Sequence, residues 1–340
     1  RALAASSRRR ARRLEDPRYA HFLRPAKKLT KYGQWAVVAR RRRERVASST
    51  PRRASRALIA RPARRRGHGT TQVTGATDGI GLALSLEFAK KGLDVVLISR
   101  TKSKLDAAAQ QIKEACPGRD VKVLALDFSG GFDAGKRAAV AKALAGLDVG
   151  ILANNVGMSY PFTKYYHELT DAECADLVAL NTESTLFMTK LVLGDESAGM
   201  IARKRGAIVN TSSAAGTQIS PLLAGYSAAK GGIVAFTKSL HYELKPKHID
   251  VQVQTPLWVT TKLAKIRKTS LTVPSPAAYA KCALKFIGYE PCASPYWMHA
   301  FQLAVMDLLP TALGVAIVSN MHHAIRKKGM KKEAEKAKAK

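Results

Sequence analysis

The 340-residue chain has few cysteines and few acidic residues, and both shortages narrow the functions that it can have. Its four cysteines lie far apart, with no Cys-x-x-Cys pair and no cluster of histidines beside them. This spacing indicates neither a disulfide framework nor a structural zinc site, so we expect no metal and a reducing compartment. Only 25 Asp and Glu residues accompany 57 Lys and Arg residues, which gives a net charge of +32.

The excess of positive charge is concentrated at the two ends of the chain. Residues 1–70 contain 23 Lys and Arg against 3 acidic residues, and residues 326–340 contain 8 against 2. Such ends are typical of contacts with nucleic acid or anionic lipid, or of unstructured tails. We interpret residues 1–34 as a basic leader with a linker and residues 321–340 as a Lys-rich tail.

Residues 39–73 form a low-complexity segment dominated by Arg, Ala, Ser and Pro. They have no pattern that would bury one face, so we interpret them as an insertion made of translated non-coding sequence. Closing such a loop costs on the order of a few kcal/mol, which a folded core can tolerate. The first strand is then either Trp35–Val38 or Thr70–Val73. A nucleic-acid-binding arm is the alternative, although no aromatic residue is interleaved with the arginines.

From Thr74 onward, apolar runs of strand length alternate with helical patterns. This alternation predicts the α/β class, with a doubly wound parallel sheet as the core of one domain at residues 35–300. The expected strands are residues 94–99, 121–127, 149–154, 207–211 and 251–255. The expected helices are residues 79–91, 107–116, 136–144, 171–193 and 225–244.

Residues 301–320 are a distinct apolar segment. Residues 301–318 of this segment read FQLAVMDLLPTALGVAIV and are interrupted by Asp307 and Pro310. Eighteen residues are at the short limit for a membrane span, and an acidic residue in the middle of a bilayer is costly. We therefore predict a kinked or shallow membrane-associated helix, with a lid over an amphiphile-binding site as the alternative.

The stretch NTSSAAGTQISPLLAGYSAAK, residues 210–230, contains side chains suited to proton donation to a carbonyl. Tyr226 and Lys230 are four positions apart, so they share one face of a helix, which Ser213 can approach from a preceding strand end. A free phenol has a pKa of about 10, and a cation about 4 Å away lowers it by roughly 3 units. We therefore expect Lys230 to acidify Tyr226, while Ser213 binds the substrate oxygen. The Tyr/Lys spacing alone is also common on ordinary amphipathic helices.

A glycine-rich turn, TGATDGIG at residues 74–81, precedes the first expected helix. Glycines at such a turn let backbone N–H groups and the helix amino end approach a pyrophosphate. A site that prefers NAD has an acidic residue after the second strand, whereas Arg100 stands there and suits the 2′-phosphate of NADPH. Alternatively, Arg100 is only the polar residue that ends a strand. The residues of the turn that we expect to bind the cofactor are Gly75, Thr77, Asp78, Gly79, Ile80 and Gly81.

These motifs, together with NNVG at residues 154–157, stand in the order found in short-chain dehydrogenases/reductases, and the chain resembles that family. It is most similar to the branch of very-long-chain 3-oxoacyl-CoA reductases and 17β-hydroxysteroid dehydrogenases. The resemblance implies a Rossmann-type domain that binds NADPH. It also implies four catalytic residues: Ser213, Tyr226, Lys230 and Asn181.

The same resemblance assigns roles to residues outside these motifs. It implies that Asp127 contacts the adenine, that Asn154 positions the backbone and that Asn181 holds a water for proton relay. Pro256 and Thr261 match the loop that closes over the nicotinamide, while Tyr226 and Lys230 also contact the cofactor. Without a function, Asp127 and Asn154 would be strand-end caps and Asn181 a satisfied polar group in a helix.

The resemblance implies reduction of 3-oxoacyl-CoA to 3-hydroxyacyl-CoA in very-long-chain fatty acid elongation. It also implies a cytosolic catalytic domain at the endoplasmic reticulum membrane, beside other elongation enzymes and without a nucleic-acid partner. The final KKEAEKAKAK resembles a dilysine retrieval signal for that compartment. Two alternatives stay open: a steroid 17-ketone reductase, and an inactive scaffold if residues 39–73 disrupt nucleotide binding.

Overall fold

The computed structural model describes residues 70–338, so the predicted leader and the candidate strand Trp35–Val38 lie outside the described residues. Its centre is a seven-stranded sheet with the order β3-β2-β1-β4-β5-β6-β7. Every neighbouring pair of strands is parallel, which confirms the predicted doubly wound sheet. The strands are β1 (Thr70–Thr74), β2 (Asp94–Ser99), β3 (Val121–Ala125), β4 (Val149–Asn154), β5 (Gly206–Thr211), β6 (Ile249–Gln254) and β7 (Cys292–Ala293).

Strand β1 corrects the boundary that we predicted for the insertion. Residues 70–73, which the sequence analysis included in that segment, form β1 together with Thr74. β1 lies in the middle of the sheet, where it pairs with β2 on one side and β4 on the other. Of the two candidate first strands, Thr70–Val73 is therefore the one found in the described part of the chain. Its β-branched residues suit this position between two strands.

Helices cover both faces of the sheet. The strands are buried on both sides, and β2 shows this by alternation: Val95 and Leu97 belong to one core, Val96 and Ile98 to the other. Helices α3, α4 and α10 pack on the first core, and α5, α7 and α9 on the second. The helices are α3 (Gly79–Lys90), α4 (Lys102–Ala115), α5 (Ala134–Leu144), α6 (Asp171–Val178), α7 (Ser184–Leu193), α8 (Gly199–Arg203), α9 (Ala224–Leu244), α10 (Pro276–Phe286), α11 (Trp297–Leu308) and α12 (Thr311–Lys338).

The segment 171–193, predicted as one regular helix, contains a wider turn. α6 and α7 are joined by the π-helical turn η4 (Ala179–Glu183). Asn181 lies in η4, and its Nδ2 donates hydrogen bonds to the carbonyl oxygens of Leu177 (2.9 Å) and Met158 (3.0 Å). The turn thus presents a polar side chain to the loop after β4, and π-turns of this kind often occur at functional sites.

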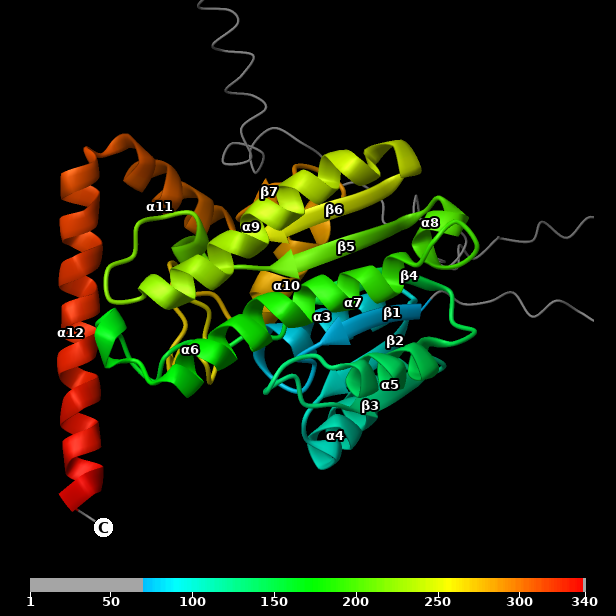
Figure 1. Ribbon diagram of the computed structural model, residues 1–340, viewed down its shortest axis with the longest axis horizontal. Coiled ribbons are helices and arrows are strands. Elements are labelled where there is room, and N and C mark those ends of the chain that lie inside the picture. Colours follow the sequence, from blue (N-terminus) through cyan, green and yellow to red (C-terminus); the bar gives the residue numbers. More distant parts are fainter. Residues whose placement is uncertain (1–69, 339–340) are drawn as a thin grey trace, which may run out of the picture.

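The apolar segment after residue 296 forms a pair of helices rather than one. α11 ends at Leu308, and α12 begins at Thr311 after Pro310, where we predicted a kink. In Figure 1 the strand arrows point toward α12, which runs along the edge of the sheet where the strands end. No helix in residues 70–338 combines the length and the apolar character that a membrane span requires.

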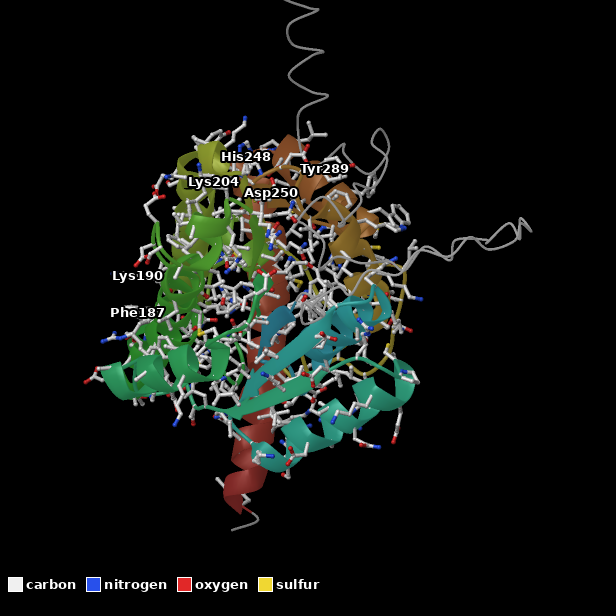
Figure 2. All side chains as sticks on the ribbon, turned by 90° about the vertical axis from the view of Figure 1, so that its right-hand side faces the viewer. Phe187, Lys190, Lys204, His248, Asp250 and Tyr289 are labelled. Atoms are coloured by element: carbon white, nitrogen blue, oxygen red, sulfur yellow. The ribbon has the colours of Figure 1, made fainter. Side chains whose placement is uncertain are left out.

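The opposite edge of the sheet is seen in Figure 2. Lys204, His248, Asp250 and Tyr289 lie together at that edge, at or just before the starts of β5, β6 and β7. In α/β sheets, ligands bind at the other edge, where strands end. The functional site is therefore expected on the side of α12.

Candidate active site

The site lies where the strand order reverses, between the ends of β1 and β4. Thr74, the last residue of β1, connects the two strands. Its Oγ1 accepts a hydrogen bond from the backbone N–H of Asn155 at 2.9 Å and donates one to the carbonyl oxygen of Ala153 at 3.4 Å. The glycine turn after β1 and the NNVG segment at the end of β4 are held side by side in this way.

The glycine turn leaves the amino end of α3 open to a ligand. The N–H of Gly75 donates to the carbonyl oxygen of Ile98 at 2.9 Å, which fixes the turn to β2. A Cβ at Gly81 would lie 2.2 Å from the carbonyl oxygen of Gly75, so only glycine fits there. Asp78 caps α3 by accepting from the N–H of Gly79 at 2.7 Å. Ile80, in the first turn of α3, packs its side chain on the core behind the turn.

The ends of β2 and β3 carry the residues predicted to bind the adenosine end of the cofactor. The hydroxyl of Thr77 lies 3.2 Å from that of Ser99, so the glycine turn reaches the end of β2, which exposed Arg100 follows. Partial burial raises the pKa of Asp127. Hydrogen bonds from Ser129 and the positive charge of Arg100 outweigh that effect, and the pKa lies below its usual value. The structure therefore places Arg100 and Asp127 close enough to interact.

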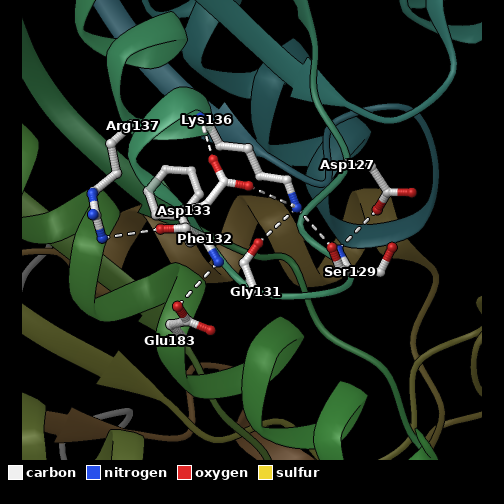
Figure 3. A network of polar contacts seen from close by, with 8 residues as sticks. All are labelled: Asp127, Ser129, Gly131, Phe132, Asp133, Lys136, Arg137 and Glu183. Atoms are coloured by element: carbon white, nitrogen blue, oxygen red, sulfur yellow. Dashed lines mark hydrogen bonds and ion pairs between the residues drawn. The ribbon is translucent and has the colours of Figure 1, made fainter.

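The loop after β3 connects this region to η4, as Figure 3 shows. The Lys136 ammonium donates to the carbonyl oxygens of Ser129 (2.8 Å) and Gly131 (2.6 Å), which folds the loop tightly. Glu183 of η4 accepts from the N–H of Phe132 at 3.0 Å. The π-turn that carries Asn181 is thus fixed to the loop after β3, which also carries Asp127.

The four predicted catalytic side chains converge near the end of β5. Ser213 follows β5, and its hydroxyl hydrogen-bonds the phenol of Tyr226 near the start of α9. One turn later, the buried Lys230 donates from Nζ to the carbonyl oxygen of Thr211 at 3.0 Å. A Cβ added to Gly157 would lie 3.0 Å from Lys230 Nζ and 2.7 Å from Asn181 Oδ1. Asn181 and Lys230 therefore meet at the NNVG segment.

The expected effect of Lys230 on Tyr226 is wrong for the protein without ligands. Burial raises the pKa of Tyr226, and the hydrogen bond from Ser213 lowers it only in part. Burial also lowers the pKa of Lys230, to about 8, and its Nζ lies 6.0 Å from the centre of the Tyr226 ring. Tyr226 therefore keeps its proton at neutral pH, as a proton donor must, and Lys230 remains mostly charged.

The side chain of Asn154 makes its hydrogen bonds within the core of the protein. Its side chain is 3% exposed, and Nδ2 donates to Thr189 Oγ1 at 3.1 Å and to Asn210 Oδ1 at 2.9 Å. These bonds connect β4 to α7 and β5. This position agrees with a role in holding the backbone of the site.

The loop after β6 reaches back over the glycine turn. The carbonyl oxygen of Pro256 accepts from the N–H of Ala214 at 3.0 Å, so the loop begins beside the Ser213 turn. Further along, the methyl group of Thr261 would be 3.0 Å from a Cβ added to Gly79. Both predicted residues of this loop are therefore at the site.

Comparison with known proteins agrees with this geometry. Residues 70–271 match the model of the short chain dehydrogenases. The chain belongs to the short-chain dehydrogenase family. It is similar to the very-long-chain 3-oxoacyl-CoA reductase-like protein of Arabidopsis thaliana, with 40% identity over 298 residues, 86% of this chain and 82% of that protein. It is also 40% identical to the human very-long-chain 3-oxoacyl-CoA reductase over 262 residues, 76% of this chain and 81% of the human protein.

Among solved structures, this short-chain dehydrogenase is similar to one from Sphingobium yanoikuyae in complex with NADPH. The TM-score is 0.61 at 28% identity, and the match covers 70% of this chain and 92% of that structure. Membership of the family makes the chain an oxidoreductase that acts on a ketone or its alcohol.

One structural residue of this dehydrogenase had no signal in the sequence. His299 of α11 is fully buried and holds the loop after β6. Its Nδ1 accepts from the N–H of Leu257 at 3.3 Å, and its Nε2 lies 3.1 Å and 3.2 Å from the carbonyl oxygens of Trp258 and Thr272. Burial lowers the pKa of His299 to about 4, so the ring is neutral with the proton on Nε2. No sequence pattern around this histidine indicates that it holds the loop after β6.

Proposed function

We propose that this chain reduces 3-oxoacyl-CoA to 3-hydroxyacyl-CoA with NADPH. The observation that carries the proposal is the convergence of Ser213, Tyr226 and Lys230 beside the open glycine turn. That convergence occurs in a chain that is 40% identical to very-long-chain 3-oxoacyl-CoA reductases over about four fifths of their length. It favours a carbonyl reductase over an inactive scaffold, because β1 and the glycine turn are both formed.

The residues present fit NADPH. The amino end of α3 faces the turn without side chains at Gly79 and Gly81, which suits a pyrophosphate. Arg100, rather than an acidic residue, follows β2 and suits a 2′-phosphate. Asp127 and Thr261 would flank the adenosine and nicotinamide ends. When bound, NADPH supplies the hydride for the reduction.

The chain's own residues would handle the proton. Tyr226 donates the proton of its phenol to the oxygen on C3 of the substrate, and Ser213 holds that oxygen with a hydrogen bond. The charged Lys230 stabilises the phenolate that remains, since it is fixed one turn away on α9. Asn181 accepts from the N–H of Met158 at 3.1 Å and holds the loop beside Lys230 in place.

Turnover of two ketones by the purified protein tests the substrate. With NADPH present, we expect kcat/KM for a long-chain 3-oxoacyl-CoA to exceed that for estrone by at least about tenfold, because the relatives are named for the thioester. A preference for estrone would replace this proposal with steroid ketone reduction. Failure to bind NADPH in a fluorescence titration would instead favour the scaffold.

We also propose that α11 and the first half of α12 rest on the membrane of the endoplasmic reticulum, with the site toward the cytosol and near other elongation enzymes. Exposed apolar side chains recur every three or four residues on both helices, which is the pattern of a helix lying in a membrane interface. They are Trp297, Phe301, Val305, Leu308, Leu313, Ile317 and Met321. The basic end of α12 would meet anionic headgroups.

Flotation with vesicles that contain anionic lipid tests this placement. The double variant Phe301→Asp and Leu308→Asp is expected to leave the vesicle fraction, whereas Tyr242→Asp, at an exposed aromatic residue on α9, is expected to remain there. Equal flotation of the wild type and the α11 variant would remove these helices as the contact surface.

A further inference from the structure

A pocket of about 730 Å³ lies between the glycine turn, the loop after β6 and the carboxyl-terminal part of α12. Four of its ten lining residues are cations: Lys262, Lys265, Arg267 and Lys332. The first three come from the loop after β6, and the last comes from a helix more than sixty positions later in the chain. Such convergence around a cavity favours an anionic ligand.

The positive charge in this pocket is only partly neutralised. Lys262 forms an ion pair with Asp78 at the cap of α3, and Lys265 donates to the carbonyl oxygen of Pro161. Within residues 70–338, neither Arg267 nor Lys332 has an acidic partner. These two side chains are therefore available to an incoming anion, and an arginine can bind a phosphate through two parallel hydrogen bonds.

Lys332 reaches the pocket because α12 is fixed across the ends of the strands. The guanidinium of Arg326 binds both carboxylate oxygens of Glu168, in the loop after β4. The carbonyl oxygen of His322 accepts from Thr163 Oγ1 at 2.6 Å. These contacts hold the middle of α12 to the loop that leads from the NNVG segment.

Two further contacts bring α12 close to loops of the same domain. His322 Nδ1 donates to the carbonyl oxygen of Pro221 at 2.6 Å, in the segment between Ser213 and Tyr226. A Cβ added to Gly329 would lie 2.2 Å from the ring of Phe162, so the helix approaches this ring as only glycine allows. These contacts hold α12 against the rest of the fold up to Gly329, one turn before Lys332.

We propose that this pocket binds the phosphates of the substrate's CoA, with Arg267 and Lys332 as the main contacts. This inference rests on the proposed reduction of a 3-oxoacyl-CoA. The reacting carbonyl must lie at Tyr226, whereas the 3′-phosphate and pyrophosphate of CoA lie at the far end of its pantetheine arm. The pocket is lined in part by Thr261, and its cations supply the charge opposite to that of these phosphates.

The position of the pocket separates this role from binding of the cofactor's 2′-phosphate. Arg100, the residue suited to that phosphate, follows β2. The loop with Arg267 follows β6, on the other side of β1 in the order of the sheet. The pocket does share Asp78, Gly79 and Thr261 with the residues expected to bind the cofactor, so the cofactor's own pyrophosphate is the competing ligand that an experiment must exclude.

The decisive variant is Arg267→Gln combined with Lys332→Gln. We expect the KM for a 3-oxoacyl-CoA to rise by at least about tenfold, since bonds between two charged groups are lost. The KM for the same acyl group on pantetheine, which lacks the nucleotide phosphates, and the KM for NADPH should not change. An equal rise in the KM for NADPH would assign the cations to the cofactor, and an unchanged KM for the CoA thioester would overturn the proposal.

A binding measurement separates this inference from the proposed function. Calorimetry with adenosine 3′,5′-bisphosphate, the nucleotide end of CoA without its thiol, should show binding to the wild type and at least about tenfold weaker binding to the double variant. Absence of binding to the wild type would overturn the pocket assignment even if the enzyme is active. If the wild type reduces neither the CoA nor the pantetheine thioester, the proposed function fails instead.

Two matched variants test whether α12 carries the site. Glu168→Gln removes the ion pair with Arg326, so it should raise the KM for the CoA thioester in the same direction and leave that for pantetheine unchanged. Lys113→Gln, which removes an exposed cation on α4, should change neither value. If Lys113→Gln raised the KM for the CoA thioester as much as the double variant does, net charge would explain the effect. That result would contradict a defined pocket.

Discussion

The two sides of Tyr226 are built in different ways. On the predicted cofactor side, the glycine turn, Arg100 and Asp127 each come within two residues of the end of a strand of one parallel sheet. On the proposed substrate side, α11 and α12 are joined to the rest of the fold by contacts between residues far apart in sequence, such as Arg326 with Glu168. The residues predicted to bind the nucleotide are therefore set by local sequence, whereas the proposed substrate side depends on tertiary packing.

The two sides also differ in how firmly they are held. β1 is buried in the middle of the sheet, with Val73 fully inaccessible. In contrast, α12 exposes most of its side chains and is attached mainly through His322, Arg326 and Gly329. Segments with few buried contacts open at lower free energy, so changes on the substrate side should leave the cofactor side intact.

Tyr226 lies between the two sides, and the substitution Tyr226→Phe should have the largest effect on turnover. Turnover of a 3-oxoacyl-CoA is expected to fall by about a thousandfold, because the proton donor is lost. Binding of NADPH and the melting temperature should stay close to wild type, since the ring still packs against the Tyr160 and Leu177 cluster.

Oxidation of NADPH, followed spectroscopically, measures that loss. The matched control is Tyr166→Phe, because Tyr166 is 62% exposed and lies outside the catalytic cluster. Undiminished turnover by Tyr226→Phe would show that another group donates the proton.

Much of the cofactor side could be predicted from the sequence. β2 and β4 match their predicted ranges because continuous apolar runs bounded by polar residues mark buried parallel strands. The glycine turn and the Ser213, Tyr226 and Lys230 set are short patterns, and the structure brings them together as expected. Each needs only a few neighbouring residues to be recognised.

The sequence predicted less where a property depends on the burial of a side chain or on contacts between residues far apart in the chain. Spacing places Tyr226 and Lys230 on one face of α9, but it does not reveal that Lys230 is buried and Tyr226 half-buried, and burial reversed the expected pKa shift of Tyr226. The π-turn at Asn181 and the helix α12 depend on partners elsewhere in the chain. Glu168 and Arg326 are 158 positions apart, so no local pattern could join them.

The substitution Arg100→Asp should change the cofactor side alone. We expect the KM for NADPH to rise by roughly tenfold to a hundredfold while the KM for NADH falls or stays level, because an acidic residue repels a 2′-phosphate and suits a free 2′-hydroxyl. Steady-state kinetics with both cofactors measure the change. The control Lys102→Asp alters the next cation along the chain, and an equal effect there would mean that net charge, not a phosphate contact, is responsible.

Substitution of His299 should have the smallest effect on activity. It tests how this histidine makes the free energy of unfolding depend on pH. Burial holds its pKa at about 4, whereas an unfolded histidine titrates near 6.5. Between these values the unfolded chain binds a proton that the folded protein does not. Stability from this group is therefore present above pH 6.5 and is lost as pH falls toward 4, by about 3 kcal/mol in total.

Urea unfolding of the wild type and His299→Gln at pH 7 and pH 4.5 isolates this contribution. The wild type should lose about 2 to 3 kcal/mol more than the variant between the two values, because glutamine does not titrate. At pH 7 the variant should loosen the loop after β6, which should raise the KM for the thioester and, because Pro256 and Thr261 lie in this loop, the KM for NADPH as well. His167→Gln, at an exposed position, should behave like the wild type. Equal pH slopes in wild type and His299→Gln would show that folding does not lower the pKa of this ring.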